Sequence, residues 1–148
     1  MTPVKVEWGK AVTTYPLRGR IETKDETGKP NGWLLAVWNV TEGLPDAYRP
    51  DQVYVTAIAP GARKGPHLHK SRTGLFTCIV GDAYLIARIS EGVYIRVSLR
   101  GQLVRVEPGI PAQLCNDSDS EAVIINMPCP AWQAHAPDEW PVEDWRPE

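Results

Sequence analysis

The 148-residue sequence has few cysteines, no excess of basic residues and no long apolar run. Its three cysteines, Cys78, Cys115 and Cys129, are widely spaced and form no Cys-x-x-Cys pair, which argues against a disulfide framework or a zinc knuckle and predicts a reducing, cytoplasmic location. Sixteen basic residues against eighteen acidic ones give a net charge of −2, which excludes a general nucleic-acid binder. The longest apolar stretch, around residues 33–38, is too short to span a bilayer, and no apolar signal segment follows the first residues. We therefore expect neither a membrane nor a nucleic acid as partner.

Almost no segment has a helical period, whereas short runs of β-forming residues recur between fourteen prolines and twelve glycines. These runs predict about ten strands: Val4–Trp8, Arg18–Thr23, Trp33–Val40, Gln52–Ala59, Leu75–Val80, Ala83–Ile89, Val93–Leu99, Gln102–Val106, Ile110–Leu114 and Ala122–Met127. Many short strands separated by tight turns are typical of an all-β sandwich or barrel. The length fits one domain, with an N-terminal strand region at about 1–50, a barrel core at about 51–127 and a tail at about 128–148.

The C-terminal tail, residues 128–148, has a different composition from the rest of the chain. It holds five prolines together with Trp132, Trp140 and Trp145. Proline denies the tail regular ladder hydrogen bonds, while each tryptophan offers a large apolar area to bury. The tail is predicted to be either a strap packed on the barrel wall or on a partner subunit, or a lid over a pocket mouth.

Two histidines, His67 and His69, are the residues whose spacing most clearly indicates chemistry. In an extended strand, positions i and i+2 point to the same face, so both imidazoles are expected to project into one space. Arg63 and Lys70 flank the pair, and nearby cations disfavour an imidazolium. At least one imidazole is therefore expected to stay neutral near pH 7 and to accept a proton.

The segment around these histidines follows the first cupin motif: Gly61, five residues, His67-Leu68-His69, and Gly81 after a β-forming run. Residues 107–116 match part of the second cupin motif. The block Arg63–Lys70 is similar to the Arg-Gly-x-His-Ala-His-Lys stretch of nucleotide-sugar 3,4-ketoisomerases, which are related to dTDP-4-keto-6-deoxyglucose 3,5-epimerases. The sequence thus resembles the RmlC-like cupins, which implies a jelly-roll, double-stranded β-helix barrel over most of the chain.

The same resemblance bears on metal binding. Where metal-binding cupins carry a glutamate and a third histidine, this sequence has Thr73 or Gly74 and Ala112. Only His67 and His69 remain, and a transition metal requires three or four donors. We therefore expect no metal and no cofactor.

The implied function is that of a metal-independent isomerase or epimerase acting on a nucleotide-linked 4-keto sugar, such as a dTDP-sugar, in carbohydrate biosynthesis. A ketone at C4 acidifies the neighbouring C–H, a neutral imidazole removes that proton, and fixed donors stabilise the enolate or enediolate. The expected catalytic residues are His67, His69 and Tyr54, with either histidine as the base. A homodimer is expected, since the resembled enzymes pair their barrels.

The expected substrate-binding residues are Arg63, Lys70, Arg72 and Arg88, because arginine forks fit phosphate oxygens. Two other functions stay open from the sequence. One is a metal-dependent cupin enzyme whose ligand set is completed by an unexpected donor such as Tyr54 or His135. The other is a non-catalytic sugar-binding cupin in which the two histidines only donate hydrogen bonds to a ligand.

Overall fold

The computed structural model describes residues 5–38 and 48–147, so the ends Val4 and Val40 of two predicted strands lie outside the described residues. The described part contains strands and no helix, and hence no helix able to cross a membrane. The strands are β1 (Val6–Trp8), β2 (Val12–Pro16), β3 (Ile21–Lys24), β4 (Pro30–Leu34), β5 (Tyr54–Ile58), β6 (Arg63–His67), β7 (Gly74–Val80), β8 (Tyr84–Ser90), β9 (Val93–Ser98), β10 (Gln102–Val106), β11 (Ala112–Cys115) and β12 (Ala122–Asn126).

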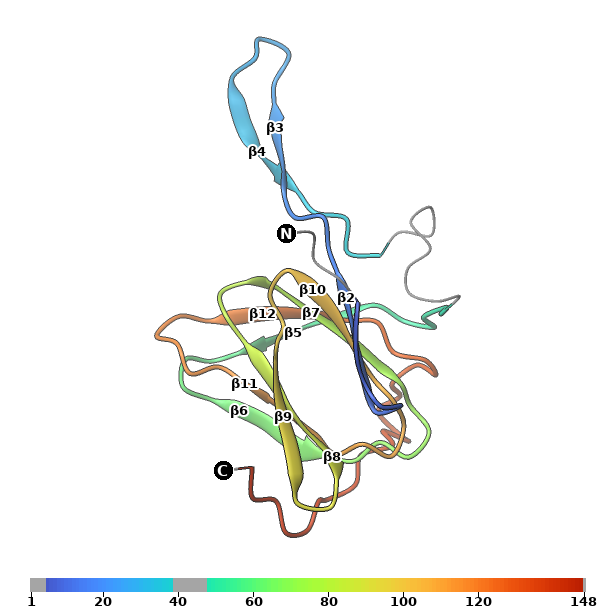
Figure 1. Cartoon of the computed structure of the whole chain (residues 1–148). Helices are drawn as coiled ribbons and strands as arrows, with labels where there is room; N and C mark the ends of the chain where they lie inside the picture. Colours follow the sequence, from blue (N-terminus) through green and yellow to red (C-terminus); the bar gives the residue numbers. More distant parts are fainter. Residues whose placement is uncertain (1–4, 39–47, 148) are drawn as a thin grey trace.

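Two antiparallel sheets face each other and form the barrel (Figure 1). The larger sheet has the order β1-β2-β10-β7-β12-β5, and the smaller one has the order β6-β11-β8-β9. Neighbouring strands are mostly distant in sequence, as in a jelly roll. The hairpin β3-β4 stands apart and projects away from the barrel (Figure 1). The predicted all-β, two-sheet barrel is confirmed, and β1 and β2 of the N-terminal region belong to the larger sheet.

Some strands differ from the prediction. β2 and β6 were not predicted, and β6 has the sequence Arg-Lys-Gly-Pro-His, which lacks β-branched and aromatic residues. β6 exists because it pairs with β11, so a tertiary partner outweighs the local preference. The predicted strands Arg18–Thr23 and Trp33–Val40 are replaced by the hairpin strands β3 and β4, which are joined by the turn that Gly28 supports with a φ of 87°.

The hydrophobic core fills the space between the two sheets. Val12, Leu85, Val104 and Ile124, which come from four different strands, are each fully buried at 0% exposure. The strands contribute alternate residues to this cluster, as Leu85 and Ala87 of β8 show. A second cluster around Tyr15, Leu75, Leu103 and Met127 closes one side of the barrel. The apolar packing anchors the strands whose ends carry the polar residues described below.

Two turn glycines allow a controlled test of the barrel's packing. Gly81 and Gly92 both adopt positive φ values, 77° and 70°. A Cβ atom at Gly81 would collide with the carbonyl oxygen of Glu121 and lie 3.0 Å from Cα of Ala122, whereas one at Gly92 would meet nothing within 4 Å. Gly92→Ala is expected to lower the free energy of unfolding by about 1 kcal/mol through backbone strain alone. Gly81→Ala is expected to cost a further ~1–3 kcal/mol because the backbone must shift.

Chemical denaturation of both variants beside the wild type measures this difference. Equal losses for the two variants would show that the turn after β7 does not pack against residues 121–122 as described.

Candidate active site

A cavity of about 630 Å³ opens inside the barrel and is lined by both sheets and by the tail. Its volume falls within the range usual for small-molecule sites. Its wall includes apolar side chains from the core strands, among them Phe76, Leu85 and Leu114. Polar side chains from several elements converge on the same space: Gln52, Tyr54, Lys64, His67, His69, Arg72, Glu107, Asn126 and Glu139. An apolar cavity with a few convergent polar groups is the arrangement of a ligand site.

A β-bulge in β6 decides which of its side chains reach the cavity. His67 pairs with Ala112, but Lys64 pairs with Leu114, so three steps along β6 oppose two steps along β11. A bulge of this kind reverses the alternation of side chains. As a result Lys64 and His67 both line the cavity, and Arg63 does not. A Cβ atom at Gly65, within the bulge, would lie 3.0 Å from the carbonyl oxygen of Ala112, so glycine permits the close approach of the strands.

The two histidines lie next to each other on the cavity wall, as the centroids of their rings are 6.1 Å apart. His67 is the last residue of β6. The residue between the histidines, Leu68, forms a two-way backbone bridge with Trp140 of the tail, with N···O distances of 3.0 and 2.9 Å. The tail therefore fixes the segment that carries both imidazoles.

Asp138 of the tail holds the loop that follows the histidines. Its carboxylate accepts hydrogen bonds from the backbone N–H groups of Lys70, Ser71 and Arg72 at 2.9–3.0 Å. Its main-chain carbonyl lies 2.6 Å from Nδ1 of His69. Burial alone would raise the pKa of Asp138, but these bonds and one from Trp140 together hold the pKa below the ordinary value of 3.8. One residue thus binds both the loop backbone and the imidazole.

The contact with Asp138 sets the tautomer of His69. A carbonyl oxygen only accepts hydrogen bonds, so Nδ1 carries the proton and Nε2 keeps its lone pair. Burial lowers the pKa of His69 below 6.5, and the charge of Arg72 acts in the same direction, while the bond to Asp138 opposes them. The imidazole is therefore neutral at pH 7 and can accept a proton through Nε2.

Arg72 presents a buried positive charge beside this imidazole. Arg72 is 5% exposed, and its Nη2 atom lies 3.2 Å from Nδ1 and 3.1 Å from Nε2 of His69. Because the two distances are nearly equal, Nη2 packs against the ring between the nitrogens and does not lie along the lone pair of Nε2. Nη1 of Arg72 is buried and has no hydrogen-bond partner among the described residues. A buried guanidinium with an unused donor is suited to receive an anionic oxygen.

Tyr54 lies on the same cavity and is oriented by Asn126. The amide nitrogen of Asn126 donates to the Tyr54 hydroxyl at 2.7 Å, and the Asn126 side-chain oxygen accepts from the backbone N–H of Leu75 at 3.1 Å. The hydroxyl oxygen is thus used as an acceptor, which leaves its own proton to donate. Lys64 donates to the hydroxyl of Thr56 at 2.8 Å on the neighbouring wall.

The predicted site residues divide into two groups. Tyr54, His67, His69 and Arg72 line one cavity. The other three predicted substrate-binding residues, Arg63, Lys70 and Arg88, do not line it.

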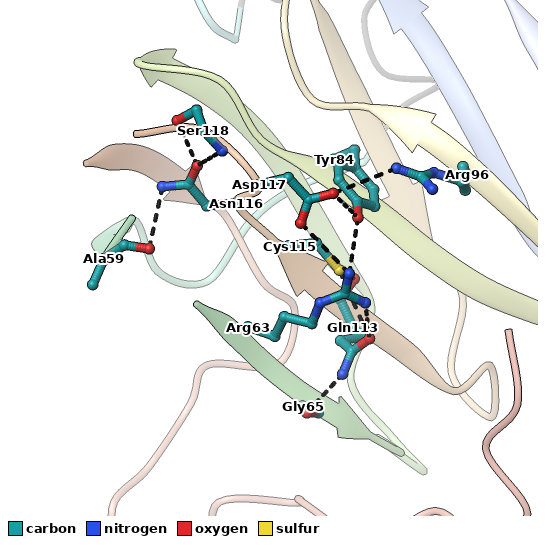
Figure 2. A network of polar contacts seen from close by, with 10 residues as sticks. All are labelled: Ala59, Arg63, Gly65, Tyr84, Arg96, Gln113, Cys115, Asn116, Asp117 and Ser118. Atoms are coloured by element: carbon teal, nitrogen blue, oxygen red, sulfur yellow. Dashed lines mark hydrogen bonds and ion pairs between the residues drawn. The ribbon is translucent and has the colours of Figure 1, made fainter. Parts of the chain in front are cut away.

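Arg63 faces the outer side of the smaller sheet, where it contacts Tyr84, Gln113 and Asp117 (Figure 2). Lys70 lies over the ring of Trp140, with Nζ 3.7 Å from the centroid.

Arg88 also faces outward, since its strand neighbours Leu85 and Ala87 belong to the core. Its Nη1 donates to the carbonyl oxygens of Glu143 and Asp144, so this arginine holds the tail. The tail packs on the barrel as a strap through these bonds, while Trp132 and Glu139 also line the cavity.

Among the described residues no group of three or more histidine, cysteine, aspartate or glutamate side chains is placed to hold a metal ion. His135, which the sequence offered as an unexpected ligand, is not among the residues that line the cavity.

Sequence reasoning missed Lys64, Asn126 and Asp138. Lys64 was not among the predicted site residues, because the bulge that turns it toward the cavity is seen only in the pairing of β6 with β11. Asn126 carries a weak signal, as a polar residue near the end of an otherwise apolar predicted strand. Asp138 is 69 residues from His69 and has no local signal that relates the two.

A scan against protein-family models and a search of curated proteins both found no match. Solved structures do match. A dTDP sugar isomerase from Desulfovibrio desulfuricans G20 is 18% identical, with 91% of this chain and 87% of that chain covered and a TM-score of 0.74. QdtA, a sugar 3,4-ketoisomerase from Thermoanaerobacterium thermosaccharolyticum solved with TDP, is 14% identical over 91% of this chain and 90% of that one, with a TM-score of 0.67.

A dTDP-4-dehydrorhamnose 3,5-epimerase from Sulfolobus tokodaii is 12% identical, covers 95% of this chain and 86% of its own, and has a TM-score of 0.70. The chain also matches CapF, a capsular polysaccharide assembling protein from Staphylococcus aureus, but it spans only 27% of that protein's length. At these identities the likeness establishes the fold alone, a cupin-type jelly-roll barrel.

Asp138 and Asp144 form a matched pair for testing the tail's hold on the site, because both have a φ of 52° and only Asp138 caps the loop. Asp138→Asn leaves one side-chain oxygen where there were two, so the bonds from Ser71 and Arg72 are lost or weakened. We expect it to lower the free energy of unfolding by about 1–2 kcal/mol, whereas Asp144→Asn should have little effect.

The pH dependence has a defined sign. Since the folded pKa of Asp138 is depressed, its ionised form stabilises the docked tail at neutral pH, and this contribution is lost as the pH falls through the folded pKa, below 3.8. Denaturation at pH 7 and at pH 3 checks this. A loss in Asp138→Asn that is as large at pH 3 as at pH 7 would contradict the role of the carboxylate.

Proposed function

We propose that this chain is a metal-independent isomerase or epimerase that acts on a nucleotide-linked 4-keto sugar by proton transfer. The observation that carries the proposal is a neutral, tautomer-fixed imidazole, that of His69, beside the buried guanidinium of Arg72 in one cavity. A base next to a fixed cation is what removal of a proton adjacent to a carbonyl requires, because negative charge develops on the carbonyl oxygen as the proton leaves.

In the proposed reaction Nε2 of His69 takes the proton from the carbon beside the C4 ketone. The C–H electrons form a carbon–carbon double bond, and the carbonyl electrons move to oxygen as an enolate. Arg72 and the hydroxyl of Tyr54 donate to this oxygen, and a proton delivered to it gives the enediol. For a 3,4-ketoisomerase, the C3 hydroxyl then loses its proton to become the ketone as C4 receives one. For an epimerase, the proton returns to the same carbon from the opposite face.

The position of His67 favours ketoisomerisation between these two outcomes. Its ring is 6.1 Å from that of His69 on the same wall, so a proton taken by one imidazole can be returned along the same face of the sugar through the other. This arrangement supports His69 as the base and His67 as the shuttle.

The nucleotide part of the substrate is supported by the structural neighbours, two of which are named for dTDP-sugars and one of which was solved with TDP. Lys64 on the cavity wall offers a cation for a phosphate oxygen, in the role that we had expected of Arg63 and Lys70. We also propose a cytoplasmic homodimer. The cytoplasm is supported by the three cysteines, which are all free, as is typical of a reducing compartment. The dimer is supported by apolar side chains on the edge strand β5 and just before it, because Val55 and Val53 are 63% and 61% exposed.

Solvent isotope exchange tests the proposed function. Incubation of the protein in D₂O with 4-keto sugar nucleotides is expected to introduce deuterium at C3 or C4, and EDTA should not change the rate. His69→Asn is expected to reduce exchange by about 10²–10⁴-fold, and His67→Asn should reduce turnover to product. His135→Asn, a matched change in the tail outside the cavity, should leave the rate unchanged.

Mass spectrometry and NMR of the recovered sugar give the readout. Failure to exchange with any 4-keto sugar nucleotide would overturn the proposed function, and stoichiometric metal with EDTA-sensitive exchange would instead support a metal-dependent cupin.

The pKa of His69 gives a second test. Because the charge of Arg72 disfavours the imidazolium, Arg72→Gln is expected to raise the pKa of His69. The acidic limb of the pH profile of kcat/KM, which lies below pH 6.5 in the wild type if His69 is the base, should then move to higher pH. Imidazole NMR titration follows the same shift without activity. Arg63→Gln, which removes an equal charge from the outer face, should leave the His69 titration in place; a shift as large as that of Arg72→Gln would contradict the assignment.

A further inference from the structure

A second hollow, of about 300 Å³, lies on the barrel and is separate from the cavity that holds the histidines. It is lined by Arg63 of β6, Ile86 of β8, Arg96 of β9, and Arg146 and Pro147 of the tail. Neither pocket shares a residue with the other. Strand β6, the β8-β9 hairpin and the tail thus bring three guanidinium groups to one place on the outer face of the smaller sheet.

Two of these arginines, Arg63 and Arg96, belong to a network of polar contacts that Figure 2 shows. Asp117 is the carboxylate within it: Oδ1 lies 3.5 Å from Arg63, and Oδ2 lies 3.8 Å from Arg96 and accepts from the Tyr84 hydroxyl at 2.7 Å. The ring of Tyr84 lies under the guanidinium of Arg96, 4.0 Å from its central carbon. The aspartate and the tyrosine therefore orient two arginines side by side.

The arginines retain most of their hydrogen-bonding capacity. The contacts of Arg63 with Tyr84, Gln113 and Asp117 are long, at 3.3–3.5 Å. Arg146 lies 3.9 Å from Asp144, and both of these side chains are more than 80% exposed. Each guanidinium has five N–H donors, so three of them offer many more donors than these weak contacts use. Three positive charges against Asp117 and Asp144 leave a net positive charge at the hollow.

The third arginine is brought to the hollow by a defined contact. The backbone N–H of Arg146 donates to the hydroxyl of Tyr94 at 2.9 Å, and the ring of Trp145 packs edge-on against Tyr94 at 5.1 Å between centroids. These contacts hold the end of the tail on the barrel, so the backbone of Arg146 has a defined place beside β9.

We propose that this hollow is a second binding site, for a phosphoryl anion held by the forks of Arg63, Arg96 and Arg146. Planar guanidinium groups match the oxygens of a phosphate in pairs, and the single positive charge that Asp117 and Asp144 leave uncompensated attracts an anionic phosphoryl group. The volume accommodates a phosphate or a diphosphate. The site does not depend on the proposed reaction, since it uses no residue of the histidine cavity.

The test is a titration followed on the arginine Nε–H signals of the ¹⁵N-labelled protein by NMR at low ionic strength. Inorganic phosphate, pyrophosphate and thymidine diphosphate are the three probes. We expect the signals of Arg63, Arg96 and Arg146 to shift together and to saturate with at least one probe. Saturation by thymidine diphosphate alone would identify a nucleotide as the source of the phosphoryl group, and saturation by phosphate or pyrophosphate would identify a free anion.

Two variants and a charge-matched control decide whether the site is specific. Arg96→Gln and Arg146→Gln are each expected to raise the dissociation constant about tenfold, because each removes charge-assisted hydrogen bonds. Arg20→Gln makes the same change of net charge on the β3-β4 side of the chain, where this arginine lies over the ring of Trp33, and should leave the dissociation constant unchanged. Arg146→Gln alters a side chain that is 83% exposed, so it should not impair folding.

Shifts that do not saturate, or an equal loss of affinity in Arg20→Gln, would overturn the proposal by showing only diffuse attraction to a charged surface. Saturable binding that persists unchanged in both Arg96→Gln and Arg146→Gln would also overturn it.

Discussion

The site depends on one aspartate that is bound in two ways. Asp138 satisfies three consecutive backbone N–H groups with its carboxylate and orients His69 with its carbonyl oxygen. Those N–H groups belong to a loop, residues 70–72, that lies outside the strands, so the carboxylate supplies the acceptors that a neighbouring strand would otherwise provide. The left-handed backbone of Asp138 turns both groups toward the loop at once. The histidine segment is therefore built by two parts of the chain that are far apart in sequence.

The electrostatics of the cavity follow from this construction. A neutral imidazole and a buried guanidinium lie in contact. The cation disfavours the imidazolium, and the neutral ring leaves the cation without a counter-charge. Because the wall around them is largely apolar, the field of Arg72 is screened less than it would be in water. Such a site favours a ligand that develops negative charge close to the place where it loses a proton.

The sequence predicted the architecture better than it predicted the site. Strands rich in β-branched residues, such as Leu75–Val80 and Ala122–Met127, were found close to their observed bounds because local preference and burial agree there. β6 was missed because its sequence has no such preference. The bulge in β6 then brought Lys64, in place of Arg63, to the cavity.

The site residues differ in the same way. His67 and His69 were found because the spacing of two is a local pattern, and Arg72 because it follows them closely. Asp138 and Asn126 act across 66 to 72 residues of sequence, and only the folded barrel brings them to their partners. Arg88 was misplaced because the sequence alone does not show which face of its strand points into the barrel. In the structure Leu85 and Ala87 face the core, and Arg88 pairs with Tyr94 of β9 and faces outward.

The tail contributes to the cavity in two ways: it holds site residues in place, and it forms part of the wall. Tyr54 and His67 lie on strands of the two sheets, and Asp138 of the tail holds His69 and the loop of Arg72. Trp132 and Glu139 enter the cavity from the irregular parts of the same tail. Substitutions between the anchors of the tail would reshape the cavity wall without disturbing any strand. Related barrels would therefore differ in the shape of the cavity wall wherever the tail lies between its anchors, while the strands and the contacts of Asp138 stayed the same.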